Sequence, residues 1–185
     1  MPTVLVPLAQ GSEELEAVTI IDVLRRAEIN VVTASLDGNT ITASRGVKLV
    51  ADTSLDEVVN QEFDMIVLPG GVAGATHLDE DERIHRILKK MSQDGKYTAA
   101  ICAAPKVLAN AGLLEGKMAT SYPGFIDKMD LPQTRVLEDT VVIDDKVITS
   151  RGPGTAMDFA LALVEKLSGK EKRDAVEAGL LRPTN

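Results

Sequence analysis

The sequence Tyr97-Thr-Ala-Ala-Ile-Cys-Ala-Ala-Pro105 predicts an apolar strand that turns sharply into a helix. Small residues after the corner permit such a turn, and Pro105 suits the first helical turn. This arrangement is typical of a nucleophile elbow, which lifts the side chain of Cys102 away from the sheet. N–H groups at the helix terminus are expected to face the sulfur and to favour the thiolate. The alternative is a buried cysteine that acts only as a small hydrophobic residue.

Apolar runs and helical patterns alternate along the rest of the chain, which predicts an α/β sandwich with buried parallel strands. Strands are expected at residues 3–8, 31–35, 64–68, 98–101, 135–137, 140–143 and 147–150. Helices are expected at residues 13–27, 82–92, 105–110, 156–167 and 170–178. No linker, internal repeat or low-complexity stretch interrupts this order, so a single domain over residues 1–185 is predicted.

Composition limits the classes of partner. The chain has 185 residues, 44% of them hydrophobic and 26% charged, which is typical of a globular protein and not of a membrane-spanning one. Its formal net charge of −8 predicts that neither nucleic acid nor an anionic membrane is a partner. The single cysteine, Cys102, and the absence of a basic leader favour a cytoplasmic location.

One glutamate of the first predicted helix lies on its apolar face. On a helical wheel, Glu16 falls between Val23 and Ala27 and close to Ile20. Burial disfavours the charged form, so we expect a raised pKa and a protonated carboxyl that can donate a hydrogen bond or move a proton. A core glutamate satisfied by backbone groups is the alternative. Ser12 is expected to cap this helix, with Glu13 and Glu14 on its solvated face.

Paired glycines follow the strand predicted at residues 64–68. Gly70 and Gly71 could turn backbone N–H groups toward an open space and line an oxyanion site, although any turn can use glycines. Groups at the carboxyl ends of parallel strands form the usual ligand crevice of an open sheet. Glu16, this glycine pair and Cys102 all follow strands, so we expect them to meet there.

Other motifs give weaker signals. The loops around Arg45 and Arg151 could each hold an anion, but ordinary loop architecture explains both equally well. The spacing of glycines at residues 112–117 and 152–154 fits neither a phosphate loop nor a dinucleotide fingerprint. His77 and His85 lack partners at metal-ligand spacing and are expected at the surface. The sequence therefore predicts neither a nucleotide site nor a metal site.

Four segments together resemble the ThiJ/PfpI superfamily, in the branch of the human Parkinson-disease protein DJ. They are Gly11-Ser-Glu-Glu-Leu-Glu16-Ala-Val, Val67-Leu-Pro-Gly-Gly71, Ala99-Ala-Ile-Cys102-Ala-Ala-Pro and Thr149-Ser-Arg-Gly-Pro-Gly-Thr155. They match the family's motifs in order and approximate spacing, nearly from end to end. The resemblance implies a flavodoxin-like three-layer sandwich with a mostly parallel central sheet, usually present as a homodimer.

The resemblance also implies roles for individual residues. Cys102 would be the reactive residue and Glu16 its protonated partner. The backbone amides implied to hold an oxyanion or an oxidised sulfur are those of Gly71 and Ala103. The arginines that match family residues near the pocket, implied as anion contacts, are Arg45 and Arg151.

Two positions depart from relatives of this superfamily. Protease-like members place a histidine directly after the cysteine, whereas this chain has Ala103, which removes the general base of peptide hydrolysis. Proteolysis is therefore not expected. The human protein has a histidine near its cysteine where Tyr122 aligns here, so Tyr122 would face the substrate instead of an imidazole.

These residues lead to two main functional hypotheses. The first is an enzyme that needs neither metal nor glutathione and converts small dicarbonyls such as methylglyoxal, or their early adducts with protein amines and thiols, to hydroxy acids. Its partners would be a small aldehyde or a glycated protein or amino acid. The second is an oxidative-stress sensor or redox-regulated chaperone in which Cys102 becomes a sulfinate. A plain interaction scaffold would instead leave the thiol with an ordinary pKa.

Overall fold

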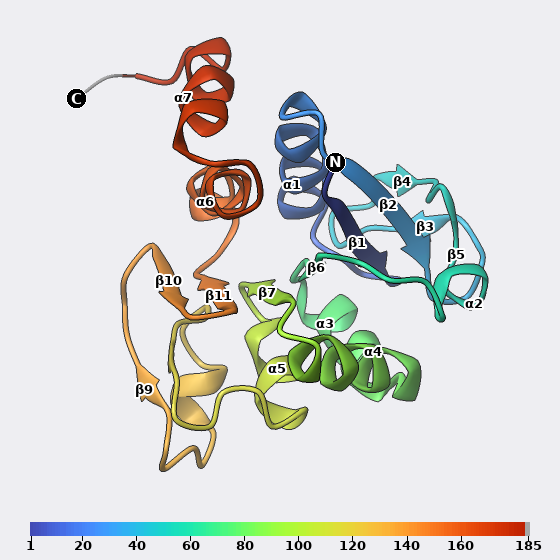
Figure 1. The fold of residues 1–185 in the computed structure, drawn as a ribbon. Helices are drawn as coiled ribbons and strands as arrows, with labels where there is room; N and C mark the ends of the chain where they lie inside the picture. The colour runs from blue at the N-terminus through green and yellow to red at the C-terminus, as the bar shows by residue number, and fades with distance from the viewer. Residues whose placement is uncertain (184–185) are drawn as a thin grey trace.

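The computed structural model describes residues 1–183 and shows a seven-stranded sheet covered by helices on both sides (Figure 1). The strands of this sheet are β1 (Thr3–Leu8), β2 (Asn30–Ser35), β5 (Thr53–Ser54), β6 (Met65–Leu68), β7 (Tyr97–Ile101), β10 (Val141–Asp144) and β11 (Val147–Ser150). The helices are α1 (Glu14–Arg26), α2 (Leu55–Val58), α3 (Val72–Glu80), α4 (Glu82–Gln93), α5 (Pro105–Asn110), α6 (Ala156–Ser168) and α7 (Lys170–Gly179).

The sheet has the order β10-β11-β7-β6-β1-β2-β5, and β10 is its antiparallel strand. The mostly parallel α/β sandwich predicted from the sequence is confirmed. Between β1 and β6 the chain changes the direction in which it adds strands, which is where ligands bind in such sheets. The carboxyl ends of β1, β6 and β7 therefore lie together at the same edge.

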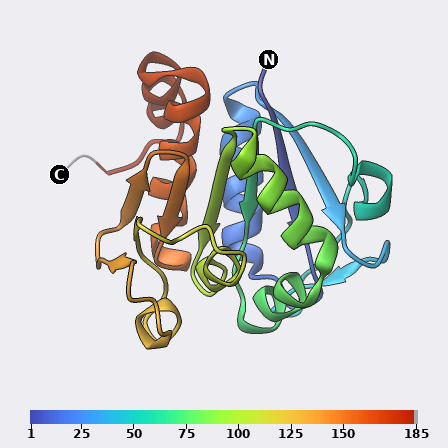
Figure 2. The same ribbon diagram turned by 60° about the horizontal axis from the view of Figure 1, so that its bottom comes forward.

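Alternate residues of each central strand face opposite layers. Val4 and Val6 of β1 pack toward α1 and α6, whereas Leu5 packs toward α3, α4 and α5. This alternation follows from the two-residue period of a strand and explains why the buried strands read as continuous apolar runs. Figure 2 shows the sheet between the two helical layers. The fully buried Phe159 of α6 is among the largest side chains of this core.

Several short elements were not predicted from the sequence. They are α2, α3, β5, the small sheet formed by β3 (Ile41–Thr42) with β4 (Lys48–Leu49), and β8 (Met118–Ala119). The strand predicted at residues 135–137 is confirmed as β9 (Arg135–Val136), which pairs with β8. In α3, Gly74 lowers helix propensity and obscures the pattern. A Cβ atom at Gly74 would lie 2.6 Å from the Cα atom of Ser12, so the close approach of α3 to the β1–α1 loop requires glycine there.

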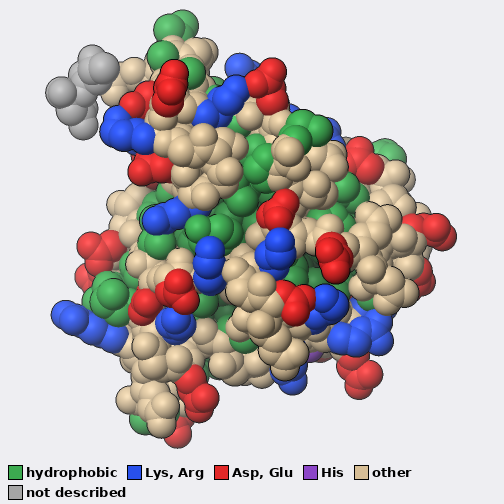
Figure 3. Space-filling view, in the orientation of Figure 1, with side chains coloured by type: hydrophobic (Ala, Val, Ile, Leu, Met, Phe, Trp, Pro, Cys, Tyr) green, Lys and Arg blue, Asp and Glu red, His purple; other side chains and the backbone are tan. Residues whose placement is uncertain are grey.

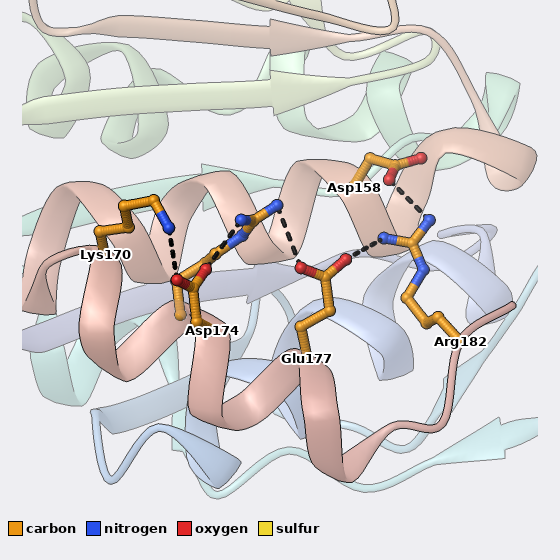
Figure 4. A network of polar contacts seen from close by, with 6 residues as sticks. Asp158, Lys170, Asp174, Glu177 and Arg182 are labelled. Carbon is orange, nitrogen blue, oxygen red and sulfur yellow. Dashed lines mark hydrogen bonds and ion pairs between the residues drawn. The ribbon is translucent and has the colours of Figure 1, made fainter. Parts of the chain in front are cut away.

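A ladder of ion pairs ties α7 to α6 (Figure 4). Arg182 reaches Asp158 of α6 at 2.7 Å and Glu177 of α7 at 3.0 Å. Arg173 lies 3.1 Å from Glu177, and Lys170 pairs with Asp174. The pairs are partly exposed, so each contributes little by itself, and α7 also inserts Val176 into the core.

Acidic and basic side chains are interspersed over the face of the molecule that Figure 3 shows. Among the described residues, no helix is both long enough and apolar enough to cross a lipid bilayer.

Candidate active site

Cys102 lies at the corner between β7 and α5, as the elbow pattern predicted. Its backbone has φ +65°, in the left-handed region that a residue with a side chain rarely adopts. The corner is fixed on both sides: the Cys102 N–H donates to the Ser150 carbonyl at 3.1 Å, and the Cys102 carbonyl accepts from the Tyr122 N–H at 2.8 Å. Such strain concentrates at functional sites. The side chain is half-buried at the edge of both helical layers.

Glu16 lies in the first turns of α1, and its side chain is fully buried. The burial predicted from the helical wheel is therefore confirmed. Its Oε1 atom accepts a hydrogen bond from the Gly70 N–H at 3.0 Å. Its Oε2 atom is buried and, within residues 1–183, has no hydrogen-bond partner. A buried carboxylate oxygen without a donor is unfavourable, which favours a proton on this carboxyl.

Gly70 brings Glu16 and Cys102 together. A Cβ atom built at Gly70 would lie 2.6 Å from the Cys102 Cβ and 2.7 Å from Glu16 Oε1, so both groups flank the same point. The Gly70 carbonyl also accepts from the Glu13 N–H at 3.0 Å. Because Glu16 already occupies the Gly70 N–H, this residue holds the acid in place and does not offer that N–H to an oxyanion.

Two other amides act on the sulfur. Hydrogen bonds from the N–H groups of Gly71 and Ala103 lower the pKa of Cys102. Burial and the charge of Glu16 outweigh them and raise the pKa of the thiol to about 12, opposite to the expectation that the helix terminus favours the thiolate. Gly71 has φ +87°, and a Cβ atom there would lie 2.3 Å from the Gly11 carbonyl oxygen, so only glycine fits.

The carboxyl and the thiol influence one another. Burial raises the pKa of Glu16 to about 7, and the nearby charge of Glu13 acts in the same direction. The charge of Glu16 is itself one reason that the pKa of Cys102 is raised, and protonation of the carboxyl removes that cause. The two groups therefore titrate as a pair, and the sulfur is most easily ionised when the proton resides on Glu16.

The loop between β1 and α1 differs from the predicted cap. Glu13, not Ser12, is the N-cap of α1 and accepts from the Leu15 N–H at 3.3 Å. Ser12 is fully buried, and its hydroxyl accepts from the Ala9 N–H, because it closes the turn after β1. Glu14, expected to be merely solvated, accepts the N–H of Arg45 at 2.9 Å. The sequence contained no signal for this long-range contact.

Three further residues, Arg45, Tyr122 and Arg151, were predicted as contacts of an anion or a substrate. Arg45 is anchored through its backbone to Glu14, and its side chain is exposed. Tyr122 bonds to the Cys102 carbonyl through its backbone, while its half-exposed ring lies against Gly152. Arg151 directly follows Ser150 at the end of β11 and is half-buried. These positions place Tyr122 and Arg151 beside Cys102, but their contact with a substrate stays a prediction.

The sequence predicted no metal site and two surface histidines. Among residues 1–183, no group of three or more His, Cys, Asp or Glu side chains is arranged to hold a metal ion. His77 is exposed, as predicted. His85 is less exposed than expected, because its ring lies 3.1 Å from Asp79.

A sharply bent cysteine, a buried acid and two converging amides at the carboxyl edge of a parallel sheet define a class of cysteine-centred α/β proteins. Residues 2–166 match the DJ-1/PfpI family, and the chain belongs to that family.

Individual relatives agree with this assignment. Protein DJ-1 homolog A of Arabidopsis thaliana is 45% identical over 99% of this chain, and the match covers 47% of the relative. The chain thus spans less than half the length of that relative. The glutathione-independent glyoxalase DJR-1.2 of Caenorhabditis elegans is 38% identical, with 94% of this chain and 90% of the relative covered.

Solved structures show the same fold. Drosophila melanogaster DJ-1beta is 44% identical and superposes with a TM-score of 0.94, covering 99% of each chain. Toxoplasma gondii DJ-1 in an oxidised form is 42% identical, also with a TM-score of 0.94, and covers 100% of each chain. The flavodoxin-like architecture implied by the sequence motifs is confirmed.

The contacts of Gly70 generate a first prediction. Replacing Gly70 with alanine should destabilise the protein by about 1–3 kcal/mol, because the new Cβ must displace Cys102 or Glu16. Urea unfolding measures this cost, and the rate of Cys102 alkylation should change with it. Gly154→Ala is the matched control, since nothing lies within 4 Å of its added Cβ. Equal stability of the two variants would show that the carboxyl and the sulfur are not packed at this glycine.

A second prediction concerns pH. The pKa of Glu16 in the folded protein, raised by burial to about 7, exceeds its ordinary value of 4.5. The stabilisation from its protonated form is complete below pH 4.5 and is lost as the pH rises through 7. Between about pH 5 and pH 8.5 the wild type should lose about 2–3 kcal/mol that Glu16→Gln retains. Urea unfolding at both pH values tests this, with the exposed Glu171→Gln as control. A pH-independent difference between wild type and Glu16→Gln would contradict the raised pKa.

Proposed function

We propose that this protein is a cofactor-independent cysteine enzyme that converts reactive dicarbonyls of the methylglyoxal type, or their early adducts with protein amines and thiols, to hydroxy acids. The observation that carries the proposal is the buried Glu16 carboxyl beside Cys102. The reaction requires a sulfur nucleophile and an acid that can release and recover a proton at the same place.

In the first step, the pair of Cys102 and Glu16 holds one proton. The sulfur attacks the aldehyde carbon, and during the attack Glu16 takes up the proton of the pair. The C–S bond forms as the carbonyl π electrons move to oxygen. The amides of Gly71 and Ala103, which already face the sulfur, are suited to hold that developing oxyanion. Glu16 then protonates the oxygen to give a hemithioacetal.

In the second step, the Glu16 carboxylate removes the hydrogen from the carbon that carries the sulfur. The electron pair moves toward the neighbouring ketone to give an enediolate. Glu16 returns its proton to the second carbon, and the hydroxyl on the first carbon passes its proton to the oxygen on the second carbon. The product is the thioester of a 2-hydroxy acid. Water attacks this thioester and the C–S bond breaks. One proton of the water molecule returns to the pair of Cys102 and Glu16, the other passes to solvent, and the product of methylglyoxal is released as lactate. The net reaction adds one water molecule and needs no external oxidant or reductant.

The C. elegans relative named as a glutathione-independent glyoxalase supports this reaction class. Ala103 also supports it over proteolysis, because no imidazole adjoins the cysteine. We further propose a cytoplasmic homodimer. The apolar side chains Leu15 and Val18 on α1, 53% and 46% exposed, are consistent with a face that another copy covers.

A second candidate function uses the same sulfur. The amides of Gly71 and Ala103 and the protonated Glu16 could hold the oxygens of a sulfinate formed when peroxide oxidises Cys102. The oxidised Toxoplasma gondii relative favours this possibility for the family. In that case the protein would report oxidative stress or act as a redox-regulated chaperone.

Turnover of methylglyoxal separates these functions. Purified wild type should release lactate, detected by NMR, whereas Cys102→Ser should lose essentially all activity because it lacks the nucleophile. Glu16→Gln should fall by about 100-fold or more, since it removes the proton carrier. The exposed variant Glu171→Gln should retain wild-type turnover. Activity that persists in Cys102→Ser would overturn the enzyme mechanism. If wild type is inactive but gains two oxygens at Cys102 in mild peroxide, the redox function is supported instead.

A further inference from the structure

An open, mainly polar hollow of about 450 Å³ lies at the amino edge of the sheet, opposite the edge that carries Cys102. Asp64, Lys96 and Lys146 directly precede β6, β7 and β11, which are parallel strands, so these residues gather at one edge. Lys166 joins them from the last turn of α6. None of the residues that perform the proposed reaction lines this hollow, so it is a separate feature of the molecule.

The charges that line the hollow do not balance. Three lysines accompany a single carboxylate, that of Asp64, although the whole chain has a net charge of −8. Both oxygens of this carboxylate are occupied, because Oδ1 lies 2.9 Å from Lys96 Nζ and Oδ2 accepts the Thr3 N–H at 3.0 Å. Within residues 1–183, neither Lys146 nor Lys166 forms an ion pair. Two ammonium groups of the hollow are therefore left without a counterion from the described chain.

Lys146 is held in place beside the hollow by an aromatic ring. Its Nζ atom lies 4.1 Å from the centre of the Tyr97 ring, which also lines the hollow, so the two form a cation–π contact. The two acidic residues that precede Lys146 are engaged elsewhere. Asp144 accepts a backbone N–H at the start of β8 at 2.8 Å, and Asp145 lies 3.8 Å from Lys117. The ring thus orders a lysine head whose charge its own turn does not neutralise.

We infer that this hollow binds a phosphate ester of a polyhydroxylated molecule the size of a six-carbon sugar. A phosphomonoester carries about 1.5 to 2 negative charges at neutral pH, which matches the two lysines without a counterion. Lysine binds phosphate as a point charge and needs no bidentate geometry. A volume of about 450 Å³ exceeds the need of a phosphate group alone, and polar walls suit hydroxyl groups better than an apolar body. The inference goes beyond the proposed function and uses none of its residues.

NMR titration of the isotope-labelled full chain with matched six-carbon polyols tests the ligand class. Sorbitol 6-phosphate, gluconate and sorbitol share a hydroxylated chain and lack an aldehyde, so none can react at Cys102 as a dicarbonyl would. Sorbitol 6-phosphate should bind about tenfold more tightly than gluconate, and sorbitol should not bind, because the larger charge of the phosphate supplies the affinity. Inorganic phosphate should bind more weakly than the ester, because it lacks the polyol chain. The shifted amide signals should centre on Tyr97 and Lys146.

Substitutions of single lysines locate the ligand. Lys146→Gln and Lys166→Gln should each weaken the binding of sorbitol 6-phosphate about threefold, and the double variant about tenfold, as is typical of exposed charge pairs. Lys89→Gln is the matched control, because it removes the same charge from an exposed position of α4 outside the hollow. This control should bind sorbitol 6-phosphate as tightly as wild type does.

Several results would overturn the inference. If sorbitol 6-phosphate does not bind, or if gluconate or inorganic phosphate binds equally well, the ligand class is wrong. An unchanged affinity in the double lysine variant would place the ligand elsewhere, and an equal loss in Lys89→Gln would reduce the effect to the overall charge of the protein. None of these measurements involves turnover, so their outcome is independent of whether the protein acts on dicarbonyls.

Discussion

Burial of a carboxyl group beside a thiol is the constraint on which this site depends. Glu16 is removed from water, and one of its oxygens has no protein donor within residues 1–183, so its ionisation is unfavourable. Cys102 is half-buried at a strained corner, and an ionised Glu16 makes its own ionisation harder. A single proton shared by the pair relieves both costs, because a neutral acid can donate to an ionised sulfur. Chemistry at the sulfur and proton transfer at the carboxyl are therefore coupled.

The sheet supplies the rigid frame for that pair. Parallel strands deliver Glu16, Gly70 and Cys102 to one edge, and the helices on both faces bury the strands that carry them. Glycine is required where these loops meet, since a side chain at Gly70 or Gly71 would collide with neighbouring groups. The stability given up at the strained corner is offset by the large apolar core beneath it.

Much of this arrangement could be predicted because local sequence patterns indicate it. The elbow at Cys102 shows in small residues after an apolar strand, and the burial of Glu16 shows in the helical wheel. Long-range contacts left no such signal: Glu14 binds the backbone of Arg45, 31 residues away. The helix α3 was not predicted because Gly74, which the close packing against Ser12 requires, lowers the helix propensity of this segment. The pKa of the thiol could not be predicted either, because it depends on how deeply the folded chain buries Cys102 and not only on the nearby helix terminus.

The proton on the Glu16 carboxyl can be observed directly by infrared difference spectroscopy of wild type against Glu16→Gln over a range of pH. The account predicts a C=O band of a protonated carboxyl that disappears with a midpoint near pH 7, the pKa to which burial raises Glu16. The same spectra should show the S–H band of Cys102 change in the same pH range. A Glu16 carboxyl that is fully ionised at pH 5 would contradict the account.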